Sequence, residues 1–325
     1  MQKQLKLPIH KSSIEEAHAL IKPFIEQTPV LKSTSINALA GCEIYFKCEN
    51  FQKIGAFKMR GATYALLQIK ANGKGKKVVT HSSGNHAQAV AKAARALDME
   101  AFIVMPRTAP KIKVEGVKAL GGKITFCEPN LKAREENMQQ IKAREGAIFV
   151  PPYDDLDVIT GQASAAKELI KEVPNLNTIL TPVGGGGLLA GSALAAYYYA
   201  NNCKVFGAEP EGADDAYRSF KAGELIPQNN PNTIADGLLT SLGDNNFKLI
   251  LQLVEAILLT SDQEIVKAMR LIWERLKIIV EPSCAVPLAA VLKNKPLFKD
   301  QKIGIILSGG NVDLDHYFEK MRPLS

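Results

Sequence analysis

Short apolar runs alternate along this chain with longer stretches in which apolar residues recur every three or four positions. The short runs favour strands, and the longer stretches favour amphipathic helices. A helix is expected from residue 13, where Ser13 and Glu16 form a capping box. The predicted strands cover residues 43–48, 77–81, 100–105, 123–127, 147–150, 177–183, 204–209, 255–260 and 302–308.

Single helices between successive strands predict right-handed crossovers, and therefore parallel sheets. We expect an α/β protein with two open, twisted, parallel-type sheets that carry helices on both faces. A chain of 325 residues exceeds what one hydrophobic core usually supports. No Pro- or Ser-rich linker marks a boundary, so we expect an insertion. The large domain would comprise residues 1–52 and 154–325, with a small domain, 53–153, inserted into it.

Charge adds little to this picture. The formal net charge of +7 is spread over isolated Lys and Arg residues, and its densest cluster, residues 74–77, lies in a predicted loop. No basic stripe with interleaved aromatic residues indicates a nucleic-acid partner. A mildly positive field instead favours small anionic substrates and phosphate cofactors.

Compartment is indicated by cysteine usage and by the N-terminus. The five cysteines are scattered and show no CxxC spacing, which favours a reducing environment and argues against structural zinc. The N-terminal segment lacks the apolar core of a secretory signal. The longest apolar run, 188–200, is too short to cross a bilayer. We therefore expect a cytoplasmic protein without a membrane partner.

Lys58 is the first candidate for chemistry. It follows Phe57 in "ENFQKIGAFKMRGA", at the start of a predicted helix. Gly55 and Ala56 leave room for close backbone approach, and Met59 begins a buried helical face. Burial at such a crowded junction would lower the pKa of the lysine and make its amine nucleophilic. On these residues alone, an exposed lysine at a helix start remains the alternative.

A second candidate is the loop at the end of a predicted strand, where small polar residues open a helix. These residues are Ser82, Ser83, Gly84, Asn85 and His86. Free backbone N–H groups at a helix N-terminus form a ready anion site. The alternative is an ordinary capped helix, with Ser83 or Asn85 as the cap.

A third candidate consists of four consecutive glycines, Gly184, Gly185, Gly186 and Gly187, between a predicted strand and an apolar helix. Ordering so many glycines costs backbone entropy, which a bound phosphate could offset. A flexible loop is one alternative. The other is a dinucleotide-binding fingerprint of the form G-x-G-x-x-A, with Glu209 about twenty residues further on. A nicotinamide oxidoreductase therefore competes at this point.

Taken together, the ordered segments resemble one family along nearly the whole chain. They run from "TPVLKSTSIN" through "GAFKMRGA", "SSGNHAQA", "GGGGLLAG", "GAEPEGADDAY" and "IADGLLTSLG" to "WERLKIIVEPS" and "LSGGNVDL". The resemblance is to the fold type II pyridoxal-phosphate enzymes, in the serine racemase and serine/threonine dehydratase branch. It implies a tryptophan synthase β-like fold, a small amino-acid substrate and a homodimer.

The resemblance also implies roles for the three candidate regions. Lys58 would form the Schiff base with pyridoxal 5′-phosphate, and Phe57 would pack beside the cofactor ring. Asn85 would bond the 3-hydroxyl oxygen of the cofactor, Gly184–Gly187 would hold its phosphate, and Ser308 would meet its pyridine nitrogen. The nicotinamide alternative explains one of these regions only, so we set it aside.

The family's chemistry then implies loss of water from short β-hydroxy amino acids, giving a 2-oxo acid and ammonia. Lys58 would remove the Cα proton, and the loop of Ser82, Ser83, Gly84, Asn85 and His86 would hold the substrate carboxylate. Racemase-like members carry Ser at position 83, where it can reprotonate Cα from the opposite face. Serine racemisation is therefore expected as a second activity.

Two positions bear on the substrate. Arg134 matches an arginine of racemase-like members, and it could take a second carboxylate. This implies L-threo-3-hydroxyaspartate ammonia-lyase as the alternative function, whereas a surface helix arginine would have no such role. Tyr153 departs from the Asn of mammalian serine racemases, which puts their nucleotide activation in doubt for this chain.

The resemblance finally implies a divalent cation, Mg²⁺ or Ca²⁺. Its ligands would be Glu209, the Ala213 carbonyl and Asp215, together with water. The alternative is a solvated acidic surface loop, since Asp214 adjoins Asp215.

Overall fold

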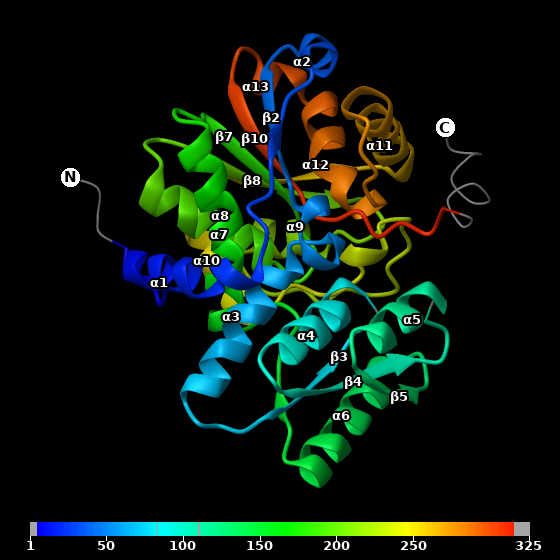
Figure 1. The fold of residues 1–325 in the computed structure, drawn as a ribbon. Coiled ribbons are helices and arrows are strands. Elements are labelled where there is room, and N and C mark those ends of the chain that lie inside the picture. Colours follow the sequence, from blue (N-terminus) through cyan, green and yellow to red (C-terminus); the bar gives the residue numbers. More distant parts are fainter. Residues whose placement is uncertain (1–4, 83, 110, 315–325) are drawn as a thin grey trace.

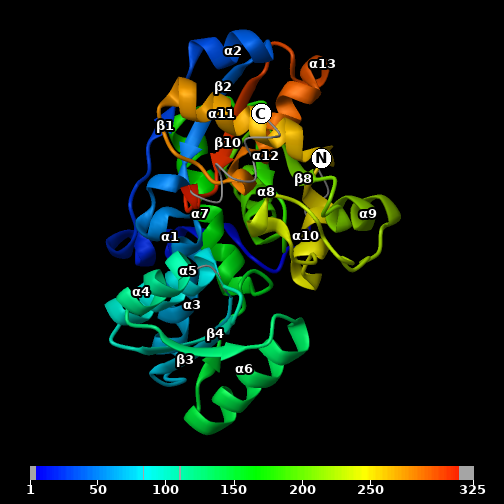
Figure 2. The same cartoon turned by 90° about the vertical axis from the view of Figure 1, so that its right-hand side faces the viewer.

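Two helix-flanked sheets form the protein, one above the other in Figure 1 and again in the turned view of Figure 2. The computed structural model describes residues 5–82, 84–109 and 111–314. The six-stranded sheet has the order β1-β2-β10-β7-β8-β9, and only its β1–β2 pair is antiparallel. The four-stranded sheet, β5-β4-β3-β6, is parallel throughout. The predicted fold class is confirmed.

All nine predicted strands occur, with ends shifted by a few residues at most. The six-stranded sheet contains β1 (Val30–Leu31), β2 (Glu43–Cys48), β7 (Thr178–Pro182), β8 (Lys204–Pro210), β9 (Ala256–Thr260) and β10 (Lys302–Leu307). The four-stranded sheet contains β3 (Lys77–His81), β4 (Glu100–Pro106), β5 (Lys123–Cys127) and β6 (Ile148–Phe149). The prediction missed β1, because a strand of two residues carries no periodicity.

Helices cover both faces of both sheets. The α-helices are α1 (Lys11–Ile21), α2 (Thr34–Ala40), α3 (Lys58–Ala71), α4 (Asn85–Ala96), α5 (Lys111–Ala119), α6 (Leu131–Glu145), α7 (Leu156–Glu172), α8 (Gly187–Tyr199), α9 (Asp215–Ala222), α10 (Asp244–Leu253), α11 (Asp262–Leu276), α12 (Pro282–Lys293) and α13 (Lys295–Phe298). Short 3₁₀ turns are η1 (Lys22–Phe24), η2 (Glu49–Phe51), η3 (Lys53–Gly55) and η4 (Asp236–Leu238).

The start of α1 corrects one prediction. The helix begins at Lys11, two residues before the expected capping box, and its N-cap, His10, makes no side-chain cap bond. Ile14 and Ala17 are buried, and Leu7 and Ile9 ahead of the helix are buried too. Packing of this apolar stripe decides where the helix starts, because it outweighs the roughly 1 kcal/mol of a cap.

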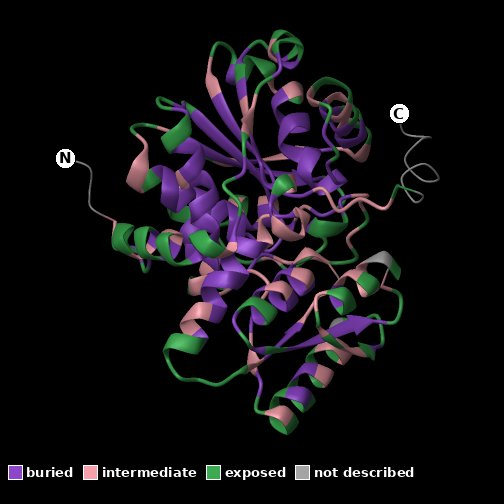
Figure 3. Ribbon diagram, viewed as in Figure 1, coloured by how far each residue is buried: buried purple, intermediate pink, exposed green. Residues whose placement is uncertain are grey.

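The core follows the alternation of side chains along the strands. In β10, Ile305 packs with α2, α11 and α12, while Ile306 packs on the other face with α7, α8 and α10. In the small sheet, Ile103 faces the layer of α3 and α4, and Phe102 faces α6. Figure 3 shows the central strands of both sheets buried beneath partly exposed helices, whereas β5 at the edge of the small sheet is mostly exposed or half-buried.

This topology brings three strand ends together. In parallel sheets, loops after the carboxyl ends of strands form the ligand-binding edge. β3 leads into residues 82–86, β7 into the glycine loop and β10 into Ser308. Among the described residues, no helix has the length and apolar character needed to cross a membrane.

Candidate active site

Lys58 begins α3 and points into the junction of the two sheets. Its Nζ donates a 2.7 Å hydrogen bond to the carbonyl oxygen of Pro152. The same nitrogen lies 5.1 Å from the ring centroid of Phe57 and 6.0 Å from that of Tyr153. Burial lowers the pKa of Lys58 to about 8, although the negative charge of Glu281 opposes the shift. The alternative of a solvated lysine is therefore wrong.

Ser308 and Phe57 are joined through the backbone. The N–H of Phe57 donates to the carbonyl oxygen of Ser308 at 3.0 Å, and Ala56 forms an isolated bridge with Gly309. Ser308 itself is buried. A Cβ on Gly309 would lie 2.7 Å from Oε1 of Glu281 and 3.2 Å from Cβ of Ala56, so a side chain here would have to displace the Glu281 carboxylate. The end of β10 is thus fixed against the start of α3.

Asn85 is the first residue of α4, and its side chain is engaged away from the helix. Nδ2 of Asn85 donates to both carboxylate oxygens of Glu281, at 2.9 and 3.3 Å. Oδ1 of Asn85 accepts from Nδ2 of Asn311 at 2.8 Å, and that nitrogen also donates to the carbonyl of Ile54 at 2.7 Å. This amide is therefore held at a fixed orientation and does not act as a helix cap.

The sequence interpretation missed Glu281 and Asn311. Glu281 precedes Pro282 at the start of α12 and is almost fully buried. Burial, with a further contribution from the charge of Asp236, raises the pKa of this carboxyl to about 7. The available signal was its isolation, because it is the one Asp, Glu, Lys or Arg between Lys277 and Lys293.

Ser82 and Gly84 lie between the end of β3 and the start of α4. The N–H of Ser82 bonds to the carbonyl of Val104 at 3.2 Å, and its Oγ accepts from the N–H of Gly84 at 3.3 Å. Gly84 is the N-cap of α4, and no described side chain caps this helix. Ser83 lies outside the described residues. The helix N-terminus is therefore suited to an anion.

His86 lies one residue into α4 and is buried. Its Nε2 is 3.2 Å from the carbonyl oxygen of Val150. Burial, followed by the positive charge of Lys58, lowers the pKa of His86 to about 3. The ring is therefore neutral at physiological pH, and it adds no charge to the site.

The four glycines form a tightly packed turn into α8. Gly186, the N-cap, has a φ of +91°, which favours glycine. A Cβ on Gly185 would lie 2.1 Å from Cγ of Tyr153, and one on Gly186 would lie 2.5 Å from Cδ1 of Leu242. Since no larger residue fits at either position, the flexible-loop alternative is wrong.

The buried side-chain amide of Asn246 holds this turn in place through hydrogen bonds. The carbonyl oxygen of Gly185 accepts from the N–H of Gly243 at 3.1 Å and from Nδ2 of Asn246 at 2.7 Å. The same Nδ2 is 3.2 Å from the carbonyl oxygen of Tyr153. Asn246 is fully buried, and its Oδ1 has no hydrogen-bond partner among the described residues. The carbonyl of Gly185 is thereby fixed from two sides, which holds the turn in one conformation.

Arg134 lies on α6, beside the end of β3. Its Nε is buried without a hydrogen-bond partner among the described residues. Burial, and then the positive charge of Arg134, lower the pKa of His81, which stacks on Phe149 at 5.3 Å between centroids. His81 immediately precedes Ser82, so Arg134 lies close to the start of the 82–86 loop.

Glu209 and Asp215 are fully buried, so the alternative of a solvated surface loop is wrong for them. Asp214 does fit it, since this partly exposed residue pairs with Arg218 at 2.8 Å. Glu209 accepts from the N–H groups of Ala216 and Tyr217, at 3.1 and 2.8 Å. Burial, and then the charge of Asp215, hold the pKa of Glu209 well above its usual range.

One carboxylate oxygen of this pair lacks a partner. Oδ2 of Asp215 accepts from the N–H of Leu242 at 2.8 Å, whereas Oδ1 is buried without a hydrogen bond among the described residues. No group of three His, Cys, Asp or Glu side chains able to hold a metal occurs in the described part of the chain. A cation here would need the Ala213 carbonyl and water, ligands that suit Mg²⁺ or Ca²⁺.

Comparison with known proteins finds relatives along most of this chain. The β-hydroxyaspartate dehydratase of Paracoccus denitrificans is 48% identical over 299 residues, covering 92% of this chain and 95% of that protein. The serine racemase of Dictyostelium discoideum is 48% identical over 307 residues, covering 93% and 94%. The structure of maize serine racemase superposes with a TM-score of 0.92 at 44% identity, covering 96% of each chain.

The family model described as "Pyridoxal-phosphate dependent enzyme" matches residues 21–309, which include all three strand-end regions. The expected relationship is confirmed, and the nicotinamide alternative is excluded. This chain belongs to the pyridoxal-phosphate-dependent enzymes.

Proposed function

We propose that this enzyme removes water from short β-hydroxy amino acids, giving a 2-oxo acid and ammonia, and that it also racemises serine. The observation that carries the proposal is the low-pKa amine of Lys58, held where three strand ends meet. Relatives named as a dehydratase and as serine racemases, 43–48% identical to this chain, support it.

The residues present fit the cofactor. We propose that Gly184–Gly187 and the start of α8 hold its phosphate, since glycine is required there and the helix N-terminus attracts anions. Phe57 would lie along the ring, Asn85 would bond the 3-hydroxyl oxygen, and Ser308 would face the pyridine nitrogen. Bound pyridoxal phosphate supplies a conjugated ring that accepts the electrons released when the Cα–H bond of the substrate breaks.

Lys58 is the proposed base in both reactions. Its neutral amine takes the Cα proton of the substrate, and the resulting ammonium can return a proton to the departing β-hydroxyl, which leaves as water. The dehydrated amino acid then hydrolyses to the 2-oxo acid and ammonia. The His86 ring is neutral and so offers no positive charge to the substrate carboxylate, which we place on the N–H groups and hydroxyl of the loop of Ser82, Ser83, Gly84, Asn85 and His86.

Racemisation needs a proton donor on the face opposite Lys58, and we assign this role to Ser83. Ser83→Ala should abolish D-serine formation, while L-serine elimination continues with a modest loss. General acid–base assistance is worth about a hundred- to ten-thousand-fold, so the two effects separate clearly. D-serine formation at the parent rate in this variant would show that the second base lies elsewhere.

Ammonia-lyase activity on L-threo-3-hydroxyaspartate is the second candidate. It is supported by the partnerless Nε of Arg134 beside the substrate loop, since guanidinium pairs well with a second carboxylate. Serine, threonine and both hydroxyaspartate diastereomers should be assayed side by side with the parent and with Arg134→Met. A selective loss of kcat/KM for hydroxyaspartate is expected.

Arg144→Met is the matched control for this comparison. Arg144 lies on the same helix but is exposed and pairs with Glu145. If Arg134→Met lowers kcat/KM equally for serine and hydroxyaspartate, or no more than Arg144→Met does, then Arg134 does not select the substrate.

We further propose that Glu209, the Ala213 carbonyl and Asp215 bind a divalent cation. The partnerless Oδ1 of Asp215 and the mutual repulsion of the two buried carboxylates support this assignment. A cation would supply the missing positive charge and, through the Asp215–Leu242 bond, would hold the segment that braces the glycine turn.

The remaining proposals concern organisation. We place the domain boundaries at residues 52/53 and 153/154, because the strands of the four-stranded sheet all fall between these limits. A homodimer and a cytoplasmic location are proposed from the family resemblance, and size-exclusion chromatography with light scattering would test the dimer.

A further inference from the structure

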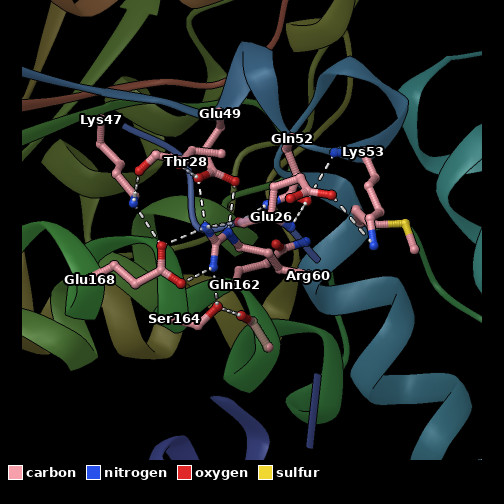
Figure 4. Close-up of polar contacts among 12 residues, drawn as sticks. Glu26, Thr28, Lys47, Glu49, Gln52, Lys53, Arg60, Gln162, Ser164 and Glu168 are labelled. Carbon is pink, nitrogen blue, oxygen red and sulfur yellow. Dashed lines mark hydrogen bonds and ion pairs between the residues drawn. The ribbon is translucent and has the colours of Figure 1, made fainter. Parts of the chain in front are cut away.

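A buried cluster of charged residues surrounds Arg60, two residues after Lys58 in the sequence (Figure 4). Arg60 is fully buried, and it forms a two-pronged ion pair with Glu49. Its Nε lies 2.7 Å from Oε2 of Glu49, and its Nη2 lies 2.8 Å from Oε1. Glu49 belongs to η2, directly after β2, so this pair links α3 to the carboxyl end of β2 in the large sheet.

A second two-pronged pair joins Arg60 to α7. Nη1 and Nη2 of Arg60 each lie 2.8 Å from an oxygen of Glu168, and Nη1 also donates to Oγ of Ser164 at 3.1 Å. An arginine side chain has five N–H donors in a rigid plane. Acceptors on η2 and α7 thereby engage all five donors, and Nη2 also lies 3.5 Å from the carbonyl oxygen of Glu26, which leaves the guanidinium a single orientation.

The cluster is balanced in charge. Lys47 is fully buried on β2, with its Nζ 2.7 Å from Oε2 of Glu168 and 2.7 Å from the carbonyl oxygen of Thr28. Two cations thus face two carboxylates, those of Glu49 and Glu168. Burying such groups carries a desolvation penalty that well-packed apolar residues would avoid. Stability alone therefore does not account for the cluster, and its geometry points to a positioning role.

That geometry bears directly on Lys58. Arg60 follows Lys58 by two residues, and at about 100° per residue their side chains point to opposite sides of α3. Lys58 faces Pro152, while Arg60 faces α7 and the end of β2. A rotation of the first helical turn of α3 that moved Lys58 would therefore break the ion pairs of Arg60.

Sliding of α3 along α7 is blocked as well. A Cβ on Gly161 would lie 2.7 Å from Cα of Gly61, and a Cβ on Gly61 would lie 2.7 Å from the carbonyl oxygen of Val158. The two helices thus meet backbone to backbone at one crossing point. With translation fixed by these glycines, the orientation of the first turn depends on Arg60.

We infer that Arg60 is a positioning residue for Lys58, and that its two-pronged ion pairs with Glu49 and Glu168 hold the lysine amine in the active site. The inference rests on the proposed role of Lys58. Displacement of a reacting group by about 1 Å can cost about a hundredfold in rate, even when the cause lies away from the chemistry.

The test uses the holoenzyme of the double variant Arg60→Met/Glu168→Met. This variant keeps the cluster neutral, because Lys47 and Glu49 remain. We measure melting temperature, total bound pyridoxal phosphate, the fraction of cofactor fixed to Lys58 by borohydride reduction and peptide mapping, and the steady-state constants for serine. The expected result is a folded, cofactor-containing protein with less cofactor fixed to Lys58, kcat lowered about a hundredfold and KM changed far less.

Arg270→Met/Glu274→Met is the control, because it removes an exposed pair of the same chemistry on α11. This control should keep the parent's kcat and the parent's fraction of cofactor fixed to Lys58 by borohydride. A folded Arg60→Met/Glu168→Met variant with the parent's trapped fraction and kcat would overturn the inference. If the double variant does not fold, the single variant Arg60→Lys tests the inference instead. Lysine keeps the positive charge but cannot form two-pronged ion pairs with both Glu49 and Glu168. A folded Arg60→Lys protein with kcat at least tenfold lower supports the positioning role, and an unchanged kcat overturns it.

The parent protein separates this inference from the proposed function. If borohydride fixes no cofactor to Lys58 in the parent, then the assignment of Lys58 is wrong, and the inference about Arg60 is wrong with it. If borohydride fixes the same fraction of cofactor to Lys58 in the parent and in the variant, the proposed function stands and only the role of Arg60 is lost.

Discussion

The amino group of Lys58 donates a 2.7 Å hydrogen bond to the backbone carbonyl oxygen of Pro152. A carbonyl accepts from an amine in either protonation state, so this bond fixes the nitrogen without requiring its charge. Burial then lowers the pKa of Lys58 to about 8. Orientation and pKa are thus set by different parts of the fold, and each can be tested by itself.

Replacement of Lys58 tests the centre of the proposal. Lys58→Ala should lose the visible absorbance of lysine-bound cofactor and all turnover of serine, because no other described amine is placed to replace it. Lys58→Arg keeps the positive charge and should fail equally, because arginine does not deprotonate in proteins. Turnover by either variant at the parent rate would contradict the assignment.

Attachment of the cofactor should depend on pH. Only the neutral amine of Lys58 is nucleophilic, so the rate at which cofactor-free protein takes up pyridoxal phosphate should rise with pH and level off above about 8. The charge of Glu281 raises the pKa of Lys58, so Glu281→Gln should move this profile to lower pH. Stopped-flow absorbance follows the reaction. A profile that levels off near 10.5, the ordinary lysine value, would contradict the desolvation of Lys58.

Glu281 should also make stability depend on pH. Its pKa is raised from 4.5 to about 7 in the folded protein, so the folded state binds this proton more tightly than the unfolded state does. The resulting stability is fully present below pH 4.5 and is lost as the pH rises through 7, in total about 3 kcal/mol. Urea unfolding of the parent and of Glu281→Gln should show a difference in the free energy of unfolding that grows over this range. Parallel curves would contradict the raised pKa.

Gly185 should not tolerate a side chain. In Gly185→Ala the new Cβ would overlap the ring of Tyr153, which should lower the free energy of unfolding by about 1–3 kcal/mol and weaken cofactor binding. Equilibrium dialysis against pyridoxal phosphate measures the second effect. The double variant Tyr153→Ala/Gly185→Ala restores the space and should recover part of the affinity. If Gly185→Ala alone binds cofactor like the parent, close packing of this turn is not required.

The proposed cation should stabilise the folded protein. A ligand that binds only the folded state adds about 2.7 kcal/mol at a hundred times its Kd, so chelation should lower both melting temperature and activity. Asp215→Asn should make the melting temperature insensitive to Mg²⁺. Asp214→Asn, at the adjacent and partly exposed position, should retain the response. A parent whose melting temperature is the same with chelator and with Mg²⁺ would contradict the proposal.

Much of this site could be predicted from the sequence alone, because its signals lie within short stretches of the chain. Alternating apolar runs predict strands and crossovers, and four consecutive glycines between a predicted strand and a helix indicate a turn. Lys58, the 82–86 loop and Ser308 each lie at a predicted strand or helix end, where ligands bind in this class of fold. The ordered motifs also indicated the family, which the comparison with known proteins confirmed.

The tertiary structure decided what depends on partners far apart along the chain. Glu281 bonds to Asn85 across 196 residues, and Asn311 does so across 226, so no window of sequence contains either pair. The partners of Arg60 are likewise distant in sequence, since the fold brings Glu49 and Glu168 to two adjacent edges of its guanidinium. Periodicity records which face of an element is buried. Which charges meet there is set by the packing of elements against one another, and only the folded chain shows it.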